Sequence, residues 1–120
     1  MNQHILFVDD DVPLRETLSL YFKMKGIAVT AAESGDKARA LAQKNSYNLA
    51  IVDLDLGGEN GMELLDFFKR TYPNLPVIMF TSLGYDPALV REAIEKGAHA
   101  YLSKTEPLDT LLKEAQKAMA

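Results

Sequence analysis

Four groups of polar residues in this sequence could act together, because each group directly follows a short apolar run. The groups are Asp9, Asp10 and Asp11 after the first run, Asp53 and Asp55 after the third, Thr81 and Ser82 after the fourth, and Ser103 and Lys104 after the fifth. If the first and third runs are neighbouring strands, at least three carboxylates crowd together and cannot all stay ionised without a cation. Mg²⁺ is the natural cation, since it prefers oxygen ligands and no Cys or His falls at these positions.

The same residues suit phosphoryl transfer. The carboxylate of Asp53 can attack a phosphoryl group, while a metal ion and the ammonium of Lys104 neutralise its oxygens and the hydroxyl of Thr81 bonds to the product. The chain has no Walker glycine loop, and residues 57–61 do not form a dinucleotide fingerprint. We therefore expect the phosphoryl donor not to be a nucleotide bound by this domain.

Strands are predicted at the five apolar runs that position these groups. The first, third and fourth runs are continuously apolar, which is typical of parallel strands covered on both faces. The second run alternates and indicates an edge strand. The five runs are residues 5–8, 27–31, 49–52, 77–80 and 98–102.

A stretch of helical periodicity follows each apolar run, with residues that favour helix starts and ends. These residues are Pro13 and Gly26 for the first helix, Ser34 for the second, Asn60 with Glu63 for the third, Asp86-Pro87 and Gly97 for the fourth, and Pro107 for the fifth. Five strand-helix pairs predict an α/β domain with a parallel sheet and helices on both faces. In such sheets ligands bind at the carboxyl ends of the strands. No linker or repeat interrupts the pattern, so we expect one domain over residues 1–120.

Composition narrows the class of protein. The chain has 120 residues, 48% of them hydrophobic, with 13 Lys and Arg against 17 Asp and Glu for a net charge of −4. These values are typical of a folded domain, and the lack of a basic cluster argues against direct nucleic-acid binding. The absence of Cys excludes disulfides and thiolate zinc sites. No apolar run approaches the ~20 residues of a membrane span, and the first is too short for a signal peptide, so we expect a cytoplasmic location.

The ordered set of these motifs resembles one family. The motifs are Val8-Asp9-Asp10-Asp11, Val52-Asp53 followed by Gly61, Phe80-Thr81-Ser82, and Gly97-Ala98 followed by Tyr101 and Lys104. Together they look like the response-regulator receiver domain of two-component signalling, over essentially the whole chain. The resemblance implies a flavodoxin-like (βα)5 fold, a three-layer sandwich whose five-stranded parallel sheet has the order 2-1-3-4-5.

The resemblance also implies a function. Asp53 would accept phosphate from a phosphohistidine on a sensor histidine kinase or a histidine phosphotransfer protein. Asp10 and Asp53 would bind Mg²⁺ directly and Asp9 through water, and the backbone carbonyl of Asp55 would complete the metal site. The domain would catalyse only its own phosphotransfer and autodephosphorylation, and would not otherwise be an enzyme.

Three further roles follow from the same resemblance. Lys104 would contact the acyl phosphate, and Thr81 would move toward it as the ring of Tyr101 turns inward. From the residues alone, Tyr101 is a half-buried core residue, and only the resemblance makes it a switch. The surface of the fourth helix, fifth strand and fifth helix would report phosphorylation to an output domain or partner, or through a homodimer.

The sequence departs from the family pattern at three places. Leu56-Gly57 replace a frequent Met-Pro, Asn60 replaces an Asp, and Thr105 replaces the proline that usually follows the lysine in a cis peptide. Asn caps a helix about as well as Asp, so that change should be mild. The peptide before Thr105 is either trans with a shifted loop or held cis by packing, since a cis bond to a non-proline costs about 2.5–4 kcal/mol.

Two other functions fit parts of the sequence. Asp53-Leu54-Asp55 also looks like the DxD motif of haloacid-dehalogenase-like phosphatases, but in that family the nucleophile lies on the first strand and the acidic pair comes later. The missing Met-Pro and Lys-Pro suggest a phosphorylation-independent interaction module with the same fold. All the expected site residues are present, which argues against this module.

Overall fold

Strands and helices alternate along the chain in the computed structural model, which describes residues 3–120. The strands are β1 (His4–Val8), β2 (Ala28–Ala32), β3 (Leu49–Val52), β4 (Val77–Thr81) and β5 (Ala100–Ser103). The helices are α1 (Val12–Met24), α2 (Gly35–Lys44), α3 (Gly61–Thr71), α4 (Pro87–Glu95) and α5 (Leu108–Met119). Within residues 3–120, no helix combines the length and the apolar character needed to cross a membrane.

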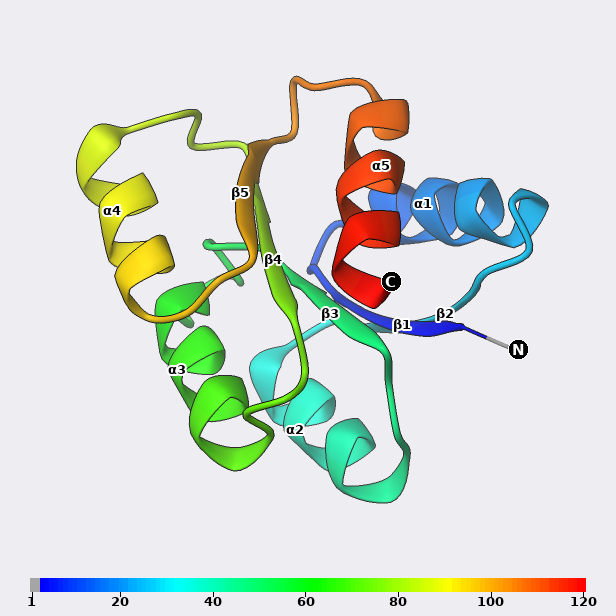
Figure 1. The fold of residues 1–120 in the computed structure, drawn as a ribbon, viewed down its shortest axis with the longest axis horizontal. Coiled ribbons are helices and arrows are strands. Elements are labelled where there is room, and N and C mark those ends of the chain that lie inside the picture. The colour runs from blue at the N-terminus through cyan, green and yellow to red at the C-terminus, as the bar shows by residue number, and fades with distance from the viewer. Residues whose placement is uncertain (1–2) are drawn as a thin grey trace.

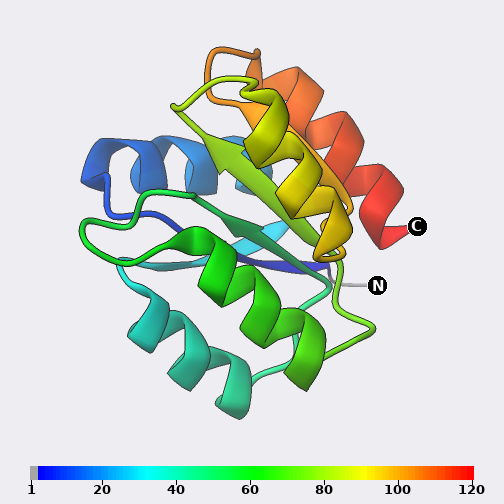
Figure 2. The same cartoon turned by 90° about the vertical axis from the view of Figure 1, so that its left-hand side faces the viewer.

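The strands form one parallel sheet in the order β2-β1-β3-β4-β5, as the resemblance implied. The alternating second run is an edge strand, which confirms that prediction. Helices α1 and α5 cover one face of the sheet, and α2 and α3 cover the other (Figure 1, Figure 2). The fold is therefore the three-layer α/β sandwich expected from the sequence.

Burial on both faces explains why the central runs are continuously apolar. In β1, Ile5 and Phe7 pack with buried residues of α1 and α5. The alternate residues Leu6 and Val8 pack with buried residues of α2, α3 and α4. Because successive side chains of a strand point to opposite faces, a strand covered on both sides needs apolar residues at every position.

Helix starts follow the capping residues of the sequence. The side chains of Asp11, Ser34 and Asn60 accept hydrogen bonds from backbone N–H groups in the first turns of α1, α2 and α3. The start of β5 is the largest difference from the predicted bounds, since the strand begins at Ala100 and not at residue 98. Residues 97 and 98 lie in the turn that closes α4, where the N–H of Ala98 donates to the carbonyl of Ala93.

The strand register brings the polar strand ends to one edge of the sheet. Val8 of β1 pairs with Val52 of β3, and the N–H of Asp53 donates to the carbonyl of Val8 at 3.0 Å. At the other side of β4, the N–H of Lys104 donates to the carbonyl of Thr81 at 2.7 Å. We call this edge, at the carboxyl ends of β1, β3, β4 and β5, the acidic edge.

Candidate functional site

Three carboxylates meet at the acidic edge. One carboxylate oxygen from each of Asp9, Asp10 and Asp53 lies within 4.8 Å of the others. Asp9 is completely buried and Asp53 is 3% exposed, whereas Asp10 is exposed to solvent. The crowding expected from the sequence is therefore present, and two of the three charges lie out of water.

Both carboxylate oxygens and the backbone carbonyl of Asp9 have polar partners. Its Oδ1 accepts a hydrogen bond from the N–H of Asp11 at 2.9 Å, and its carbonyl accepts one from Nη1 of Arg15 at 2.8 Å. Its Oδ2 lies 2.7 Å from Nζ of Lys104 and forms an ion pair with it. This oxygen accepts no regular hydrogen bond. Oδ2 is thus a buried oxygen that could also bind a metal cation.

Lys104 also contacts the predicted phosphoacceptor. Its Nζ donates to Oδ2 of Asp53 at 2.9 Å, and Oδ1 of Asp53 accepts from the N–H of Asp55 at 3.3 Å. Burial raises the pKa of Asp53 above its ordinary value, and the nearby ammonium offsets only part of this rise. Burial by itself would lower the pKa of Lys104, but the ion pairs with Asp9 and Asp53 outweigh it and the pKa is raised.

The donor set fits a hard divalent cation. Clustered carboxylate oxygens, one of them buried without a regular hydrogen bond, are the ligands that Mg²⁺ prefers. Asp9, Asp10 and Asp53 could hold the ion. The side chain of Asp55 lies outside this cluster, is exposed, and accepts a hydrogen bond from the N–H of Gly57 at 3.2 Å. The contribution of the Asp55 carbonyl stays a prediction.

The two predicted switch residues meet at the loop after β4. Thr81 is buried at the end of β4, and its Oγ1 accepts a hydrogen bond from the N–H of Leu83 at 3.1 Å. The hydroxyl of Tyr101 donates to the carbonyl of Gly84 at 2.6 Å, and the residue is 7% exposed. Both side chains thus fasten the β4–α4 loop, and the ring of Tyr101 is more buried than the half-buried position expected from the sequence.

The peptide between Lys104 and Thr105 is trans. Oγ of Ser103 accepts the N–H of Thr105 at 3.1 Å and lies 2.7 Å from its Oγ1, so a hydroxyl-stabilised turn follows β5. Of the two conformations left open by the sequence, the trans form is present. The ammonium of Lys104 nevertheless reaches Asp53.

At two positions near the acidic edge, steric crowding explains why the residue is glycine. A Cβ on Gly61 would overlap the backbone carbonyl oxygen of Asp53, so only glycine lets α3 start this close to β3. Gly57 has a φ of 65°, and a Cβ there would lie 2.9 Å from Oδ2 of Asp10. The loop that replaces Met-Pro therefore leaves no room for a side chain at Gly57, beside one of the clustered carboxylates.

Sequence reasoning did not find two groups of residues beside the site. Arg15 supports the backbone of Asp9, and Arg39 of α2 pairs with Glu59 of the β3–α3 loop at 2.9 Å. Arg15 falls one helical turn after the capping residue Asp11, which was a usable signal. No local pattern connects Arg39 with Glu59, because they are 20 residues apart.

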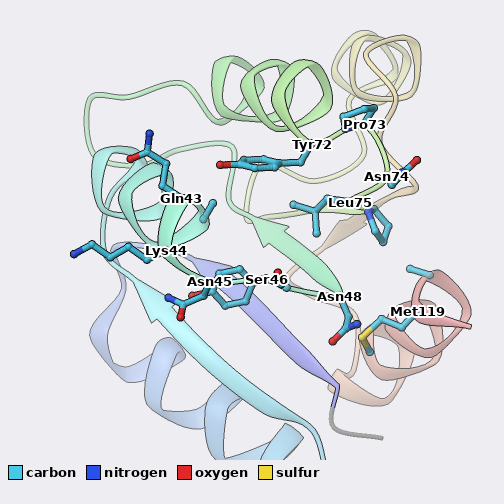
Figure 3. A pocket seen from close by; sticks show the side chains of 14 residues that line it. Gln43, Lys44, Asn45, Ser46, Asn48, Tyr72, Pro73, Asn74, Leu75 and Met119 are labelled. Carbon is cyan, nitrogen blue, oxygen red and sulfur yellow. The ribbon is translucent and has the colours of Figure 1, made fainter.

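A pocket of about 720 Å³ lies at the opposite edge of the sheet. It is formed by the α2–β3 loop, the α3–β4 loop and the end of α5, and Figure 3 shows Asn48, Leu75 and Met119 around it. The two loops precede β3 and β4, whereas the acidic edge follows the strands. The carboxylate cluster therefore lies away from this pocket.

Comparison with known proteins identifies the family. The sequence model of the response regulator receiver domain matches residues 5–116. Transcriptional regulatory protein GlrR of Escherichia coli (strain K12) is 32% identical over 116 residues, which cover 97% of this chain and 26% of GlrR. The chain thus spans about a quarter of the length of this curated relative.

Solved structures agree with this assignment. The receiver domain of NtrX from Brucella abortus has a TM-score of 0.89 at 31% identity, covering 96% of this chain and 97% of that one. A response regulator protein from Burkholderia pseudomallei, with a phosphorylated aspartic acid, calcium ion and citrate, has a TM-score of 0.90 at 26% identity, covering 98% and 69%. The chain therefore belongs to the response regulator receiver domain family of two-component systems.

Proposed function

We propose that this receiver domain is a switch operated by Mg²⁺-dependent phosphorylation of Asp53, with the phosphoryl group taken from a phosphohistidine of a sensor histidine kinase or a histidine phosphotransfer protein. The observation that carries the proposal is the meeting of Asp9, Asp10 and Asp53 within 4.8 Å, with Nζ of Lys104 2.9 Å from Oδ2 of Asp53. One nucleophile, an acidic metal site and a fixed ammonium are the parts that phosphoryl transfer needs.

Each residue has a distinct task in the proposed reaction. A carboxylate oxygen of Asp53 forms the new bond to phosphorus while the bond from phosphorus to the donor nitrogen breaks. Lys104, already at the carboxylate, neutralises charge on the phosphoryl oxygens. A Mg²⁺ ion held by the three aspartates would neutralise the remaining charge. The domain then acts only on its own acyl phosphate, and we infer no other enzymatic activity.

The phosphoryl group would be read out through the β4–α4 loop. Thr81 Oγ1 now accepts from the N–H of Leu83, and the hydroxyl could leave this bond for a phosphoryl oxygen. Because Tyr101 is bonded to Gly84 of the same loop, a change at Thr81 would alter the α4–β5–α5 surface. We infer that this surface contacts an output domain, a partner protein or a second copy of the chain.

The comparisons support the proposal by analogy. The Burkholderia pseudomallei protein carries a phosphorylated aspartic acid and a calcium ion, so the shared fold accommodates both groups. GlrR is a transcriptional regulatory protein, and this chain matches 26% of it. By the same analogy, we infer that this receiver controls an output domain. We also infer that it lies in the cytoplasm, where a kinase could reach it.

Intact-protein mass spectrometry tests the proposal. The protein is incubated with acetyl phosphate or phosphoramidate, with Mg²⁺ or with EDTA, beside the variants Asp53→Asn and Asp36→Asn. We expect the wild type and Asp36→Asn to gain the mass of one phosphoryl group only with Mg²⁺, and Asp53→Asn to gain none. Asp36→Asn is the matched control, because its side chain is 98% exposed and lies outside the carboxylate cluster.

Two outcomes would support other functions. No adduct on the wild type, together with no beryllofluoride-induced spectral change, would favour a phosphorylation-independent interaction module. Steady turnover of para-nitrophenyl phosphate that depends on Asp53 would favour a phosphatase.

A further inference from the structure

The loop between β3 and α3 is a tight turn beside the carboxylate cluster. Asp55 and Asn60 form an antiparallel bridge, and the N–H of Leu56 donates to the carbonyl of Glu59 at 3.1 Å. The two residues at the tip, Gly57 and Gly58, have φ values of 65° and 111°. Type I′ turns require a positive φ at both central residues. This requirement favours glycine at both positions.

The tip of this turn lies next to the proposed metal site. The position of a Cβ on Gly57 lies 2.9 Å from Oδ2 of Asp10, with no other side chain as near. Asp10 is exposed, so the carboxylate has few neighbours that could fix its direction. The place of the turn therefore limits where the carboxylate of Asp10 can lie.

A side chain of the turn anchors it to α2. Oε2 of Glu59 lies 2.9 Å from Nη1 of Arg39, and the two side chains are 27% and 28% exposed. The carboxylate of Glu59 also packs against Gly35, where any Cβ would overlap it. Arg39 is fixed in turn, with its guanidinium 5.3 Å from the centre of the Phe67 ring. The half-buried pair thus connects a rigid helix to a loop whose tip has two glycines.

We propose that Arg39 and Glu59 are positioning residues for the metal site, because their ion pair holds the Gly57–Gly58 turn against Asp10. The inference rests on the proposed function, since it concerns how well the three aspartates bind Mg²⁺. The chain lacks the proline common at this loop, and the ion pair restricts the loop from outside. Groups that orient metal ligands typically change metal affinity about 10–100-fold when they are removed.

The sign of the effect separates positioning from simple electrostatics. Replacing Arg39 with Met removes a positive charge near an acidic site, so electrostatics alone would make Mg²⁺ bind more tightly. A loosened turn would make Mg²⁺ bind more weakly. Asp36 provides the control, because its carboxylate also contacts Arg39, at 3.1 Å, but is 98% exposed.

The experiment measures the Mg²⁺ dissociation constant by isothermal titration calorimetry. The proteins are the wild type, Arg39→Met, Glu59→Ala, the double variant, and Asp36→Asn. We expect each single variant to bind Mg²⁺ about tenfold more weakly. The double variant should bind no more weakly than the single variants, since both residues act through one contact. Asp36→Asn should stay within twofold of the wild type.

A spectroscopic readout accompanies the titration. In ¹⁵N-correlated NMR spectra of the metal-free proteins, we expect the Gly57 and Gly58 amide signals to shift in both single variants and not in Asp36→Asn. Circular dichroism and thermal unfolding establish that the variants are folded. If a variant does not fold, Gly35→Ala is used instead, because its Cβ would displace the carboxylate of Glu59.

Each contrary result has a clear meaning. Unchanged or tighter Mg²⁺ binding by Arg39→Met would overturn the inference. Additive weakening in the double variant would also overturn it, because the residues would then act independently. If the wild type itself binds no Mg²⁺, the proposed function fails first, and this result is distinct from the others.

Discussion

Removal of the Lys104 ammonium should destabilise the metal-free domain. Nζ lies 2.7 Å from Oδ2 of Asp9 and 2.9 Å from Oδ2 of Asp53, and both aspartates are buried. Lys104→Met keeps the length and the apolar stem of the side chain but leaves two buried carboxylates without their cation. The folded state then carries an uncompensated desolvation cost that the unfolded chain does not have.

The size of the effect follows from burial. Breaking a buried ion pair by removing one partner costs about 3–5 kcal/mol. The side chain of Lys104 is 18% exposed, so water reaches part of the site and we take the lower end, about 3 kcal/mol. For a domain of this size such a loss lowers Tm by about 10 °C.

Urea unfolding followed by circular dichroism measures this loss, in EDTA and again with Mg²⁺. Because a ligand of the folded state stabilises it, Mg²⁺ should raise the unfolding free energy of Lys104→Met more than that of the wild type. The control is Lys37→Met. Lys37 lies 3.9 Å from Glu33 and both side chains are more than half exposed, so we expect a change below about 0.5 kcal/mol.

Two results would refute this reasoning. A loss below about 1 kcal/mol in EDTA would mean that solvent, not Lys104, compensates the buried carboxylates. An equal Mg²⁺-induced stabilisation of the variant and the wild type would mean that metal and ammonium do not neutralise the same charges.

Three further predictions test other parts of the site. Gly61→Ala should lower the unfolding free energy in urea by about 2 kcal/mol and reduce the phosphoryl adduct, because its Cβ would overlap the Asp53 carbonyl; wild-type stability and adduct would contradict this. Tyr101→Phe should cost about 1 kcal/mol and speed amide hydrogen exchange around Gly84, since a 2.6 Å hydrogen bond is lost; unchanged exchange would argue against this link. Asp10→Ala should leave the metal-free protein at least as stable as the wild type, because one of three like charges is removed. The same variant should lose the stabilisation by Mg²⁺ that thermal unfolding measures, and persistent stabilisation would place the metal elsewhere.

The loop at Gly57 and Gly58 illustrates how far local reasoning extends. Two glycines by themselves have more conformational freedom than a proline would have at this loop. The structure instead has a closed turn in which both glycines have positive φ. A glycine pair is compatible with both states, and the distinction depends on the bridge between Asp55 and Asn60 and on the pairing of Glu59.

Residue order by itself determined the architecture and the composition of the acidic edge. Short, continuous apolar runs that alternate with helical stretches are typical of parallel strands covered on both faces, and polar residues after each run share one edge because parallel strands end on the same side. This is why Asp9, Asp53 and Lys104 could be grouped from the sequence. Strand periodicity is a local property, so it can be read from neighbouring residues.

Tertiary structure alone decided which side chains touch and how they are oriented. Lys104 and Asp53 are 51 residues apart, and Arg39 and Glu59 are 20 apart. Whether such pairs meet depends on the packing of helices against the sheet and on side-chain rotamers. The placement of Gly57 beside Asp10 was settled in the same way, because several near-equal local conformations exist and packing selects one. The trans peptide before Thr105 instead follows the general preference of bonds to residues other than proline.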